Sequence, residues 1–246
     1  FQSDSETLNA IWELCKYTIK ATSALGIYID GDRERIPYEA DAIINQLSHY
    51  TTDREYAMGR RSSEYLLEHP TWPTEWILQA LIIAWNDYLY TGDRRSIEAN
   101  YDILKARTLQ SLRRENGLIS TTDDRVQSDE FKSSIRFYGN MRDIVDWPRC
   151  GDWPHGEDDH YHLTDYNTVV NAFHYRALEI LQQMALLTNR TAEAEALQKE
   201  CQTLREAFNE LLFDTENGVY RDGVDSDHVT LHSNLFPLAL GRVDKG

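Results

Sequence analysis

Apolar residues recur at helical spacing along most of the chain, which predicts a helical protein. A capping motif at 3–6 precedes the first helix, whose apolar positions are Leu8, Ile11, Trp12, Cys15 and Ile19. Further helices are predicted around 42–50 and at Tyr56–Leu67, Thr74–Tyr90, Asp93–Glu115, Asp165–Leu187 and Ala192–Leu212, with a helix or buried segment at Leu231–Leu240. Prolines after Leu67 and a glycine after Thr91 mark two of the helix ends.

The predicted helices alternate between two kinds of pattern. Thr74–Tyr90 and Asp165–Leu187 are apolar nearly all round, whereas the helix that follows each of them carries a charged face. Such alternation is typical of helical hairpins arranged in two concentric layers. No exact repeat is present, which disfavours tetratricopeptide or HEAT arrays. We therefore predict an all-α fold, an (α/α)6 toroid that is incomplete in this chain, with residues 1–246 as one partial barrel domain.

The helical pattern lapses in the middle of the chain. Residues 116–163 accumulate glycine, proline, aspartate and histidine, and they are too polar for a core element and too aromatic for a linker. We predict a long ordered loop over a site there. A second interruption, the turn at 214–218, precedes 219–223, which is predicted to be a short strand or an extended connection.

Composition narrows the class of protein and of partner. The chain has 246 residues, 41% of them hydrophobic, but no apolar run that could span a membrane. Its formal net charge of -16 argues against nucleic acid or an anionic membrane as partner and favours neutral substrates. Cys15, Cys150 and Cys201 are too far apart for a zinc motif or a disulfide framework. Because the chain opens on Phe1 rather than methionine, we expect it to be a piece of a longer protein.

The densest chemistry lies at Asp30–Asp41, which holds five carboxylates, two arginines and a tyrosine between two helical patterns. Gly31 and Pro37 prevent a regular helix there. A loop so costly to desolvate is more often a site than a connector. The alternative is a purely structural role, in which the acids form salt bridges with Arg33, Arg35 and Arg54 that fix the loop.

Aromatic residues beside carboxylates indicate what such a site would bind. Examples are Glu75-Trp76, Asp146-Trp147 and Asp152-Trp153. A ring can stack on the apolar face of a pyranose while carboxylates hold its hydroxyls, so the pairs favour a sugar pocket. Any one of these tryptophans can equally be core packing, and only their clustering with acids favours the pocket.

The loop resembles the signature of α-L-rhamnosidases of glycoside hydrolase family 78. Tyr38 and Asp41 follow Glu34 at the offsets of that signature. Segments in matching order continue the resemblance over nearly the whole chain: Trp76, Trp85, Tyr88, Thr91-Gly92-Asp93, Asp146-Trp147-Pro148, 167–178 and His232–Leu238. Tyr38 and Ala40 stand where the family usually has tryptophan and glycine, and the spacing from Asp30 to Glu34 is about one residue shorter than in many relatives, which places the chain in a divergent branch.

The resemblance implies an inverting, exo-acting glycosidase that removes terminal rhamnose without a cofactor or metal. It implies that Glu34 is the general acid and that the substrate-binding residues are Asp30, Arg35, Tyr38, Asp41, Trp76, Asp146 and Trp147. Because a general acid must hold a proton, we expect the heads of Arg33 and Arg35 to turn away from Glu34 or to pair with other acids.

The resemblance also implies what this chain lacks. The family's general base lies further along the barrel, so the chain alone is expected to have little or no activity. Glu75 and Asp152 are weak candidates for a substitute base. The resemblance further implies accessory β-domains and a secreted or periplasmic setting, whereas the sequence itself leaves the location unknown.

Two other function classes stay open. One is another (α/α)-barrel glycosidase or an enzyme that processes uronic-acid oligosaccharides, with Arg33, Arg35 or Arg142 binding the carboxylate. The other is a non-catalytic helical interaction scaffold. The scaffold fails if Asp30, Glu34 and Asp41 converge with Trp76 on one cavity. Separately, 155–162 holds histidines and acids of metal-ligand type, but their spacing favours a solvated loop over a metal site.

Overall fold

The computed structural model describes residues 1–31, 33–145 and 160–241. Its helices are α1 (Glu6–Ala21), α2 (Glu39–Thr52), α3 (Ala57–Glu68), α4 (Thr74–Thr91), α5 (Arg95–Ala106), α6 (Asp129–Ile135), α7 (Thr168–Leu187), α8 (Thr191–Leu212) and α9 (Leu231–Ala239). Two 3-10 turns, η1 (Gln110–Leu112) and η2 (Asp124–Gln127), lie between α5 and α6. Two antiparallel hairpins pair β1 (Ser23–Ala24) with β2 (Ile27–Tyr28) and β3 (Phe213–Asp214) with β4 (Val219–Tyr220).

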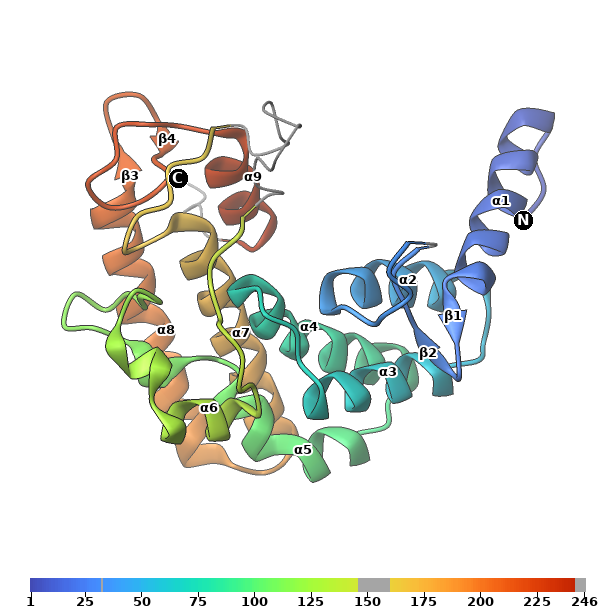
Figure 1. Ribbon diagram of the computed structural model, residues 1–246, viewed down its shortest axis with the longest axis horizontal. Helices are drawn as coiled ribbons and strands as arrows, with labels where there is room; N and C mark the ends of the chain where they lie inside the picture. The colour runs from blue at the N-terminus through green and yellow to red at the C-terminus, as the bar shows by residue number, and fades with distance from the viewer. Residues whose placement is uncertain (32, 146–159, 242–246) are drawn as a thin grey trace.

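The helices form an arc of two layers (Figure 1). In the inner layer α2 packs on α4, α4 on α7, and α7 on α9. The inner helices α2, α4 and α7 have outer neighbours, since α1 packs on α2, α3 and α5 on α4, and α8 on α7. The all-α, two-layer arrangement predicted from the sequence is therefore confirmed.

The inner helices are the ones with apolar residues on nearly all sides. Leu78 and Leu81 of α4 and Leu178 and Leu181 of α7 are fully buried in one continuous core. Burying a leucine side chain contributes about 1.5–3 kcal/mol to the free energy of folding. The packing of α4 on α7 therefore supplies much of the stability of the fold.

Local signals explain where α4 and α7 begin and end. Gly92 closes α4 in the left-handed conformation at φ 69°, and its N–H donates to the Tyr88 carbonyl at 2.7 Å. Asn167 caps α7, and its side-chain oxygen accepts the N–H groups of Val169 at 2.9 Å and Val170 at 3.3 Å. Both features were predictable from residue type.

Two sequence predictions about the chain after α4 are wrong. The helix expected to reach Glu115 ends at Ala106, because Leu109 turns the chain at φ 60° into the short η1. The segment 116–163 also contains a helix that the pattern did not predict. Ser128 caps this α6, which buries Phe131 and Ile135. Seven residues are too few to show helical periodicity clearly.

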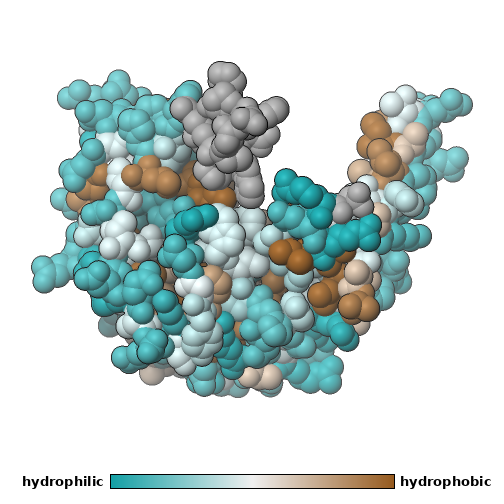
Figure 2. Space-filling view, viewed as in Figure 1, coloured by the Kyte–Doolittle hydropathy of each residue, from teal (hydrophilic) through white to brown (hydrophobic). Residues whose placement is uncertain are grey.

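The outer helix α1 leaves an apolar stripe uncovered at one end of the arc (Figure 2). Leu8, Ile11 and Leu14 are half or more exposed, and Ile19 is the one buried residue of the helix. Among the described residues, no helix combines the length and apolarity that crossing a bilayer requires.

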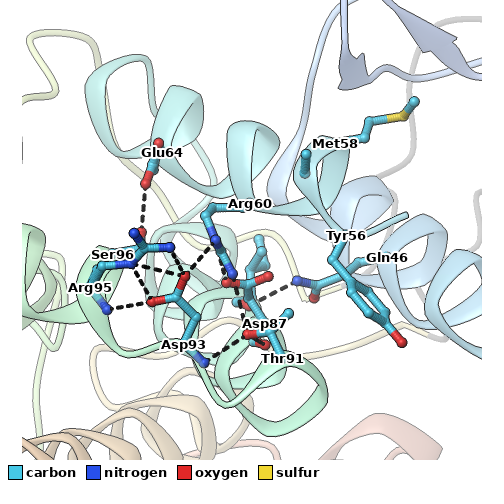
Figure 3. Close-up of polar contacts among 12 residues, drawn as sticks. Gln46, Tyr56, Met58, Arg60, Glu64, Asp87, Thr91, Asp93, Arg95 and Ser96 are labelled. Carbon is cyan, nitrogen blue, oxygen red and sulfur yellow. Dashed lines mark hydrogen bonds and ion pairs between the residues drawn. The ribbon is translucent and has the colours of Figure 1, made fainter. Parts of the chain in front are cut away.

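A polar network joins α3, α4 and α5 at the C-terminal end of α4 (Figure 3). Arg60 Nε donates to the buried Asp87 at 2.9 Å, and Arg60 Nη1 donates to Asp93 at 2.9 Å. Arg95 Nη2 also donates to Asp93, at 2.6 Å. The Tyr50 hydroxyl also donates to Asp87, at 2.8 Å. We call these five residues the Asp87 network.

Candidate active site

The charged loop folds back on itself before α2 begins. Ile29 continues the β1–β2 hairpin, and its N–H donates to Thr22 O at 2.9 Å. The Asp30 N–H then donates to the Ile36 carbonyl at 2.7 Å, which closes the intervening residues into a tight loop. Arg35 adopts a left-handed conformation at φ 56°, unusual for a residue with a side chain. This closure brings the Asp30 and Glu34 carboxyl groups together.

The loop forms one wall of a cavity of about 140 Å³. The residues that line it are Asp30, Arg33, Glu34, Tyr38, Asp41, Trp72 and Trp76. Five of the predicted site residues therefore converge on one space, which contradicts the scaffold hypothesis. Arg35 does not line this cavity. Asp146 and Trp147 lie outside the described residues.

Glu34 is held by three neighbours within the loop. The Tyr38 hydroxyl donates to its Oε2 at 2.8 Å, and Arg33 Nη2 donates to its Oε1 at 3.1 Å. The third neighbour is the carboxyl group of Asp30, which is hydrogen-bonded to Glu34. The hydrogen bonds from Tyr38 and Asp30, reinforced by the charge of Arg33, hold the pKa of Glu34 below its usual range.

The expectation that Arg33 turns away from Glu34 is wrong. The two side chains are adjacent in sequence and form an ion pair at the rim of the cavity. The Arg33 side chain is 78% exposed and that of Glu34 33%, so water screens much of the attraction.

The pKa values of the other two carboxyl groups of the cavity shift in the opposite direction. Desolvation, followed by the hydrogen bond and charge of Glu34, raises the pKa of Asp30. Desolvation and the charge of Asp30 likewise raise the pKa of Asp41. The cavity thus crowds three carboxyl groups against one arginine, and Asp30 and Glu34 are hydrogen-bonded to each other.

The indole rings of Trp72 and Trp76 also line the cavity, and the Tyr38 ring contacts one of them. The Tyr38 and Trp76 rings meet edge to face, with centroids 5.3 Å apart at 68°. Trp72 lies 6.5 Å from Trp76 at 35°, and the guanidinium of Arg142 covers the Trp72 ring at 4.4 Å. Trp72 is a cavity residue that the sequence reasoning missed. Its proximity to Pro70 and Pro73 and to Trp76 was visible in the sequence, but its orientation was not.

Glu75 does not line the cavity, although it precedes Trp76. Its buried carboxylate accepts the N–H groups of Ile144, at 3.2 Å, and Val145, at 2.8 Å. Burial, together with the charge of Asp143, raises the pKa of Glu75 to about 8. Its hydrogen bonds to backbone make it an anchor for 144–145 rather than the substitute base considered above, and Asp152 lies outside the described residues.

The histidine-rich segment packs against a distant part of the chain through His162. Within the described ranges, no three histidine, cysteine or acidic side chains are placed to hold an ion. His162 instead stacks on His228, with ring centroids 4.2 Å apart, and His228 Nδ1 contacts the buried Asp222 at 2.7 Å. Asp222 also accepts the His162 N–H at 2.9 Å, so the cluster joins the segment before α7 to the segment before α9. Residues 155–159 of that motif are not described.

Comparisons with known proteins identify the family and the fold. A family model described as the bacterial alpha-L-rhamnosidase six-hairpin glycosidase domain matches residues 1–246. Among solved structures, a GH78 family rhamnosidase of Bacillus sp. GL1 is similar at a TM-score of 0.75 and 17% identity, over 98% of this chain and 25% of that chain. A rhamnosidase from Klebsiella oxytoca with rhamnose bound is similar at 0.74 and 14%, over 98% and 45%.

The two structures establish the fold alone, because their sequence identities to this chain are low. The (α/α)6 class predicted from the sequence is therefore confirmed. The chain spans about a quarter of the first structure's length and less than half of the second's. A search of curated proteins gave no match.

Proposed function

The chain belongs to the bacterial α-L-rhamnosidase six-hairpin glycosidase domain family, and from that premise we propose that it binds the terminal rhamnose and supplies the general acid of an inverting, exo-acting α-L-rhamnosidase. The observation that carries this proposal is the cavity in which Glu34 meets Asp30, Tyr38 and Trp76. A glycosidase domain of this family acts on carbohydrate, and a monosaccharide unit with several hydroxyls suits a small space lined by acids and indole rings.

In the proposed reaction Glu34 gives its proton to the glycosidic oxygen as the bond from that oxygen to the anomeric carbon breaks. Water attacks the anomeric carbon from the opposite face and passes a proton to a second carboxylate, which inverts the configuration. The proton for the first step is proposed to come from the hydrogen-bonded pair of Asp30 and Glu34. Covering by the sugar then favours the protonated form of Glu34, because desolvation penalises its charge.

The remaining cavity residues are proposed to hold the sugar. Asp30 and Asp41 accept hydrogen bonds from its hydroxyls, and Tyr38 and Trp76 contact its apolar face. Arg35, Asp146 and Trp147 remain proposed contacts on the family resemblance alone. The carboxylate that activates water is proposed to come from another part of the barrel, so residues 1–246 alone are expected to show little or no turnover.

A second candidate rests on Arg33, whose largely exposed guanidinium lies at the cavity rim. That position suits an anionic group on a uronic-acid oligosaccharide, which is the substrate of the alternative (α/α)-barrel enzyme. Neutral and carboxylated sugars therefore need to be compared directly.

The test is a screen of the full-length protein against aryl glycosides of several neutral and uronic sugars. The proposal predicts release of the aryl group from the α-L-rhamnoside above all others, with the product first observed by NMR as the inverted anomer. Preferential cleavage of a uronide would favour the second candidate. Rhamnose released with retained configuration would contradict the inverting mechanism.

A further inference from the structure

Glu39 is a fully buried carboxylate at the edge of the candidate active site. It is the first residue of α2, directly after Tyr38 and two residues before Asp41, yet it does not line the cavity. A buried charge without partners would cost several kcal/mol, so the contacts of Glu39 explain why it is tolerated.

Those contacts lead to the connection between α3 and α4. The Thr71 backbone N–H donates to Glu39 Oε1 at 3.2 Å, and the Thr71 hydroxyl donates to Oε2. Thr71 immediately precedes Trp72, and the same connection leads into Trp76. Glu39 therefore ties the wall formed by Tyr38 and Asp41 to the wall formed by the two indole rings.

A second buried charge lies behind Glu39. Arg107 follows α5 and is also fully buried, and its Nη2 donates to the Leu67 carbonyl at 3.0 Å. Burial lowers the pKa of Arg107 to about 10, and the charge of Glu39 opposes that effect. Burial likewise raises the pKa of Glu39, while the Thr71 hydroxyl and then Arg107 oppose it. The two charges thus stabilise each other in the interior.

Together the pair fixes the α3–α4 connection at two points. Arg107 binds Leu67 near the end of α3, and Glu39 binds Thr71 four residues later. Buried charges that act on each other can often be replaced by apolar residues without loss of stability, so stability alone is a weak reason for Glu39 and Arg107. The hydrogen bonds of Glu39 to Thr71, next to Trp72, point instead to the relative placement of the residues that line the cavity.

We propose that Glu39, supported by Arg107, is a positioning residue that holds Trp72 and Trp76 against Tyr38 and so sets the geometry in which Tyr38 contacts Glu34. The proposal rests on the proposed function for its effect on catalysis, but not for its effect on the position of the rings. Misplacement of catalytic groups by about 1 Å lowers rates by roughly 100-fold, so a shifted wall has a measurable consequence.

The test compares Thr71→Val, which deletes the hydroxyl donor but keeps the shape, with Thr71→Ser, which keeps the hydroxyl. Glu39→Gln is the second variant, and Tyr50→Phe is the matched control because it deletes a hydroxyl donor from the buried Asp87. In the full-length protein, Thr71→Val and Glu39→Gln are expected to lower kcat/KM for an aryl rhamnoside by about 10-fold to 100-fold, mainly through kcat. Thr71→Ser is expected to keep kcat/KM close to the wild-type value, and Tyr50→Phe is expected to leave kcat/KM unchanged.

A second readout reports on the rings without any turnover. The protein is labelled with fluorotryptophan, and the fluorine NMR signals are assigned with Trp72→Phe and Trp76→Phe. Thr71→Val and Glu39→Gln are expected to shift the signals of both rings, whereas Tyr50→Phe is not. Unshifted signals in a folded Thr71→Val protein would overturn the proposal, as would equal losses of kcat in Thr71→Val and Tyr50→Phe. If the wild type hydrolyses no rhamnoside, the proposed function fails, and the NMR experiment still decides the role of Glu39.

Discussion

The two ends of α4 carry the same kinds of charged residue in opposite arrangements. At its C-terminal end, Asp87 and Asp93 of the Asp87 network are matched by Arg60 and Arg95. At its N-terminal end, beside Trp76, the cavity collects three carboxyl groups and one arginine.

The consequence of this difference appears in the pKa values. Hydrogen bonds from Arg95, with support from Arg60, hold the pKa of Asp93 well below its usual range, so this group stays charged. In the cavity the shifts differ in sign: desolvation and neighbouring acids raise the pKa values of Asp30 and Asp41, whereas the hydrogen bonds from Tyr38 and Asp30 lower the pKa of Glu34. Matched charges hold helices together, whereas carboxyl groups whose pKa values are pushed apart within one cavity are typical of a functional site.

The largest expected effect comes from the unmatched end. Glu34→Gln in the full-length protein is expected to lower kcat for a phenyl rhamnoside by about 100-fold to 10,000-fold, because it removes general acid catalysis. The fold and the thermal unfolding midpoint are expected to remain as in the wild type, since the side chain lies at the surface of the cavity. Steady-state kinetics and circular dichroism measure both.

Glu64→Gln is the control for that substitution. Glu64 accepts a hydrogen bond from Ser96 at 2.7 Å beside the Asp87 network and does not line the cavity. Full activity is expected in this variant. An equal loss in both variants would show that the cavity has no special role.

The next effect belongs to the matched end. Asp87→Asn leaves Arg60 without its buried partner and is expected to lower the free energy of unfolding by about 3 kcal/mol. Urea denaturation measures this loss. The kcat of the protein that remains folded is expected to be unchanged, and a fall in kcat without a loss of stability would reverse the roles assigned to the two ends.

A smaller effect is expected when Tyr38 loses its hydroxyl. The hydrogen bond from Tyr38 is the main cause that lowers the pKa of Glu34, so Tyr38→Phe raises that pKa. A general acid works only while protonated, and its activity disappears as the pH rises through its pKa. The alkaline limb of the pH–rate profile should therefore move to higher pH. A shift to lower pH would contradict the assignment of Glu34.

The smallest effect is expected from the exposed arginines. Arg95 and Arg33 each form an ion pair at the surface, with side chains 84% and 78% exposed. Such pairs add little to stability, so Arg95→Ala and Arg33→Ala should both unfold at the wild-type temperature in differential scanning calorimetry. They should differ in activity, because only Arg33 contacts Glu34. Equal pH–rate profiles for the two variants would show that the Arg33 contact is incidental.

The sequence predicted the parts of this molecule whose signals are local. The helices α4 and α7 have long apolar patterns, and both helices were predicted, as was the end of α4 at Gly92. The acidic wall was predictable because Asp30, Glu34 and Asp41 lie within twelve residues of one another.

The parts that depend on distant contacts could not be predicted. Glu39 resembled one more acid of the loop, since its burial depends on Thr71 and on Arg107, far along the chain. Leu109 has a left-handed backbone conformation, although glycine and asparagine are the residues that usually indicate such a turn in a sequence. The pairing of Arg33 with Glu34 depends on the side-chain geometry of a closed loop, which residue type does not determine.

The role of Glu34 as proton donor is tested most directly by the leaving group. Wild type and Glu34→Gln are compared on a dinitrophenyl rhamnoside, whose leaving group departs without a proton, and on a phenyl or alkyl rhamnoside, whose leaving group needs one. The account predicts that Glu34→Gln stays within about 10-fold of the wild-type kcat on the activated substrate and loses 100-fold or more on the other. An equal loss of kcat on both substrates would contradict it.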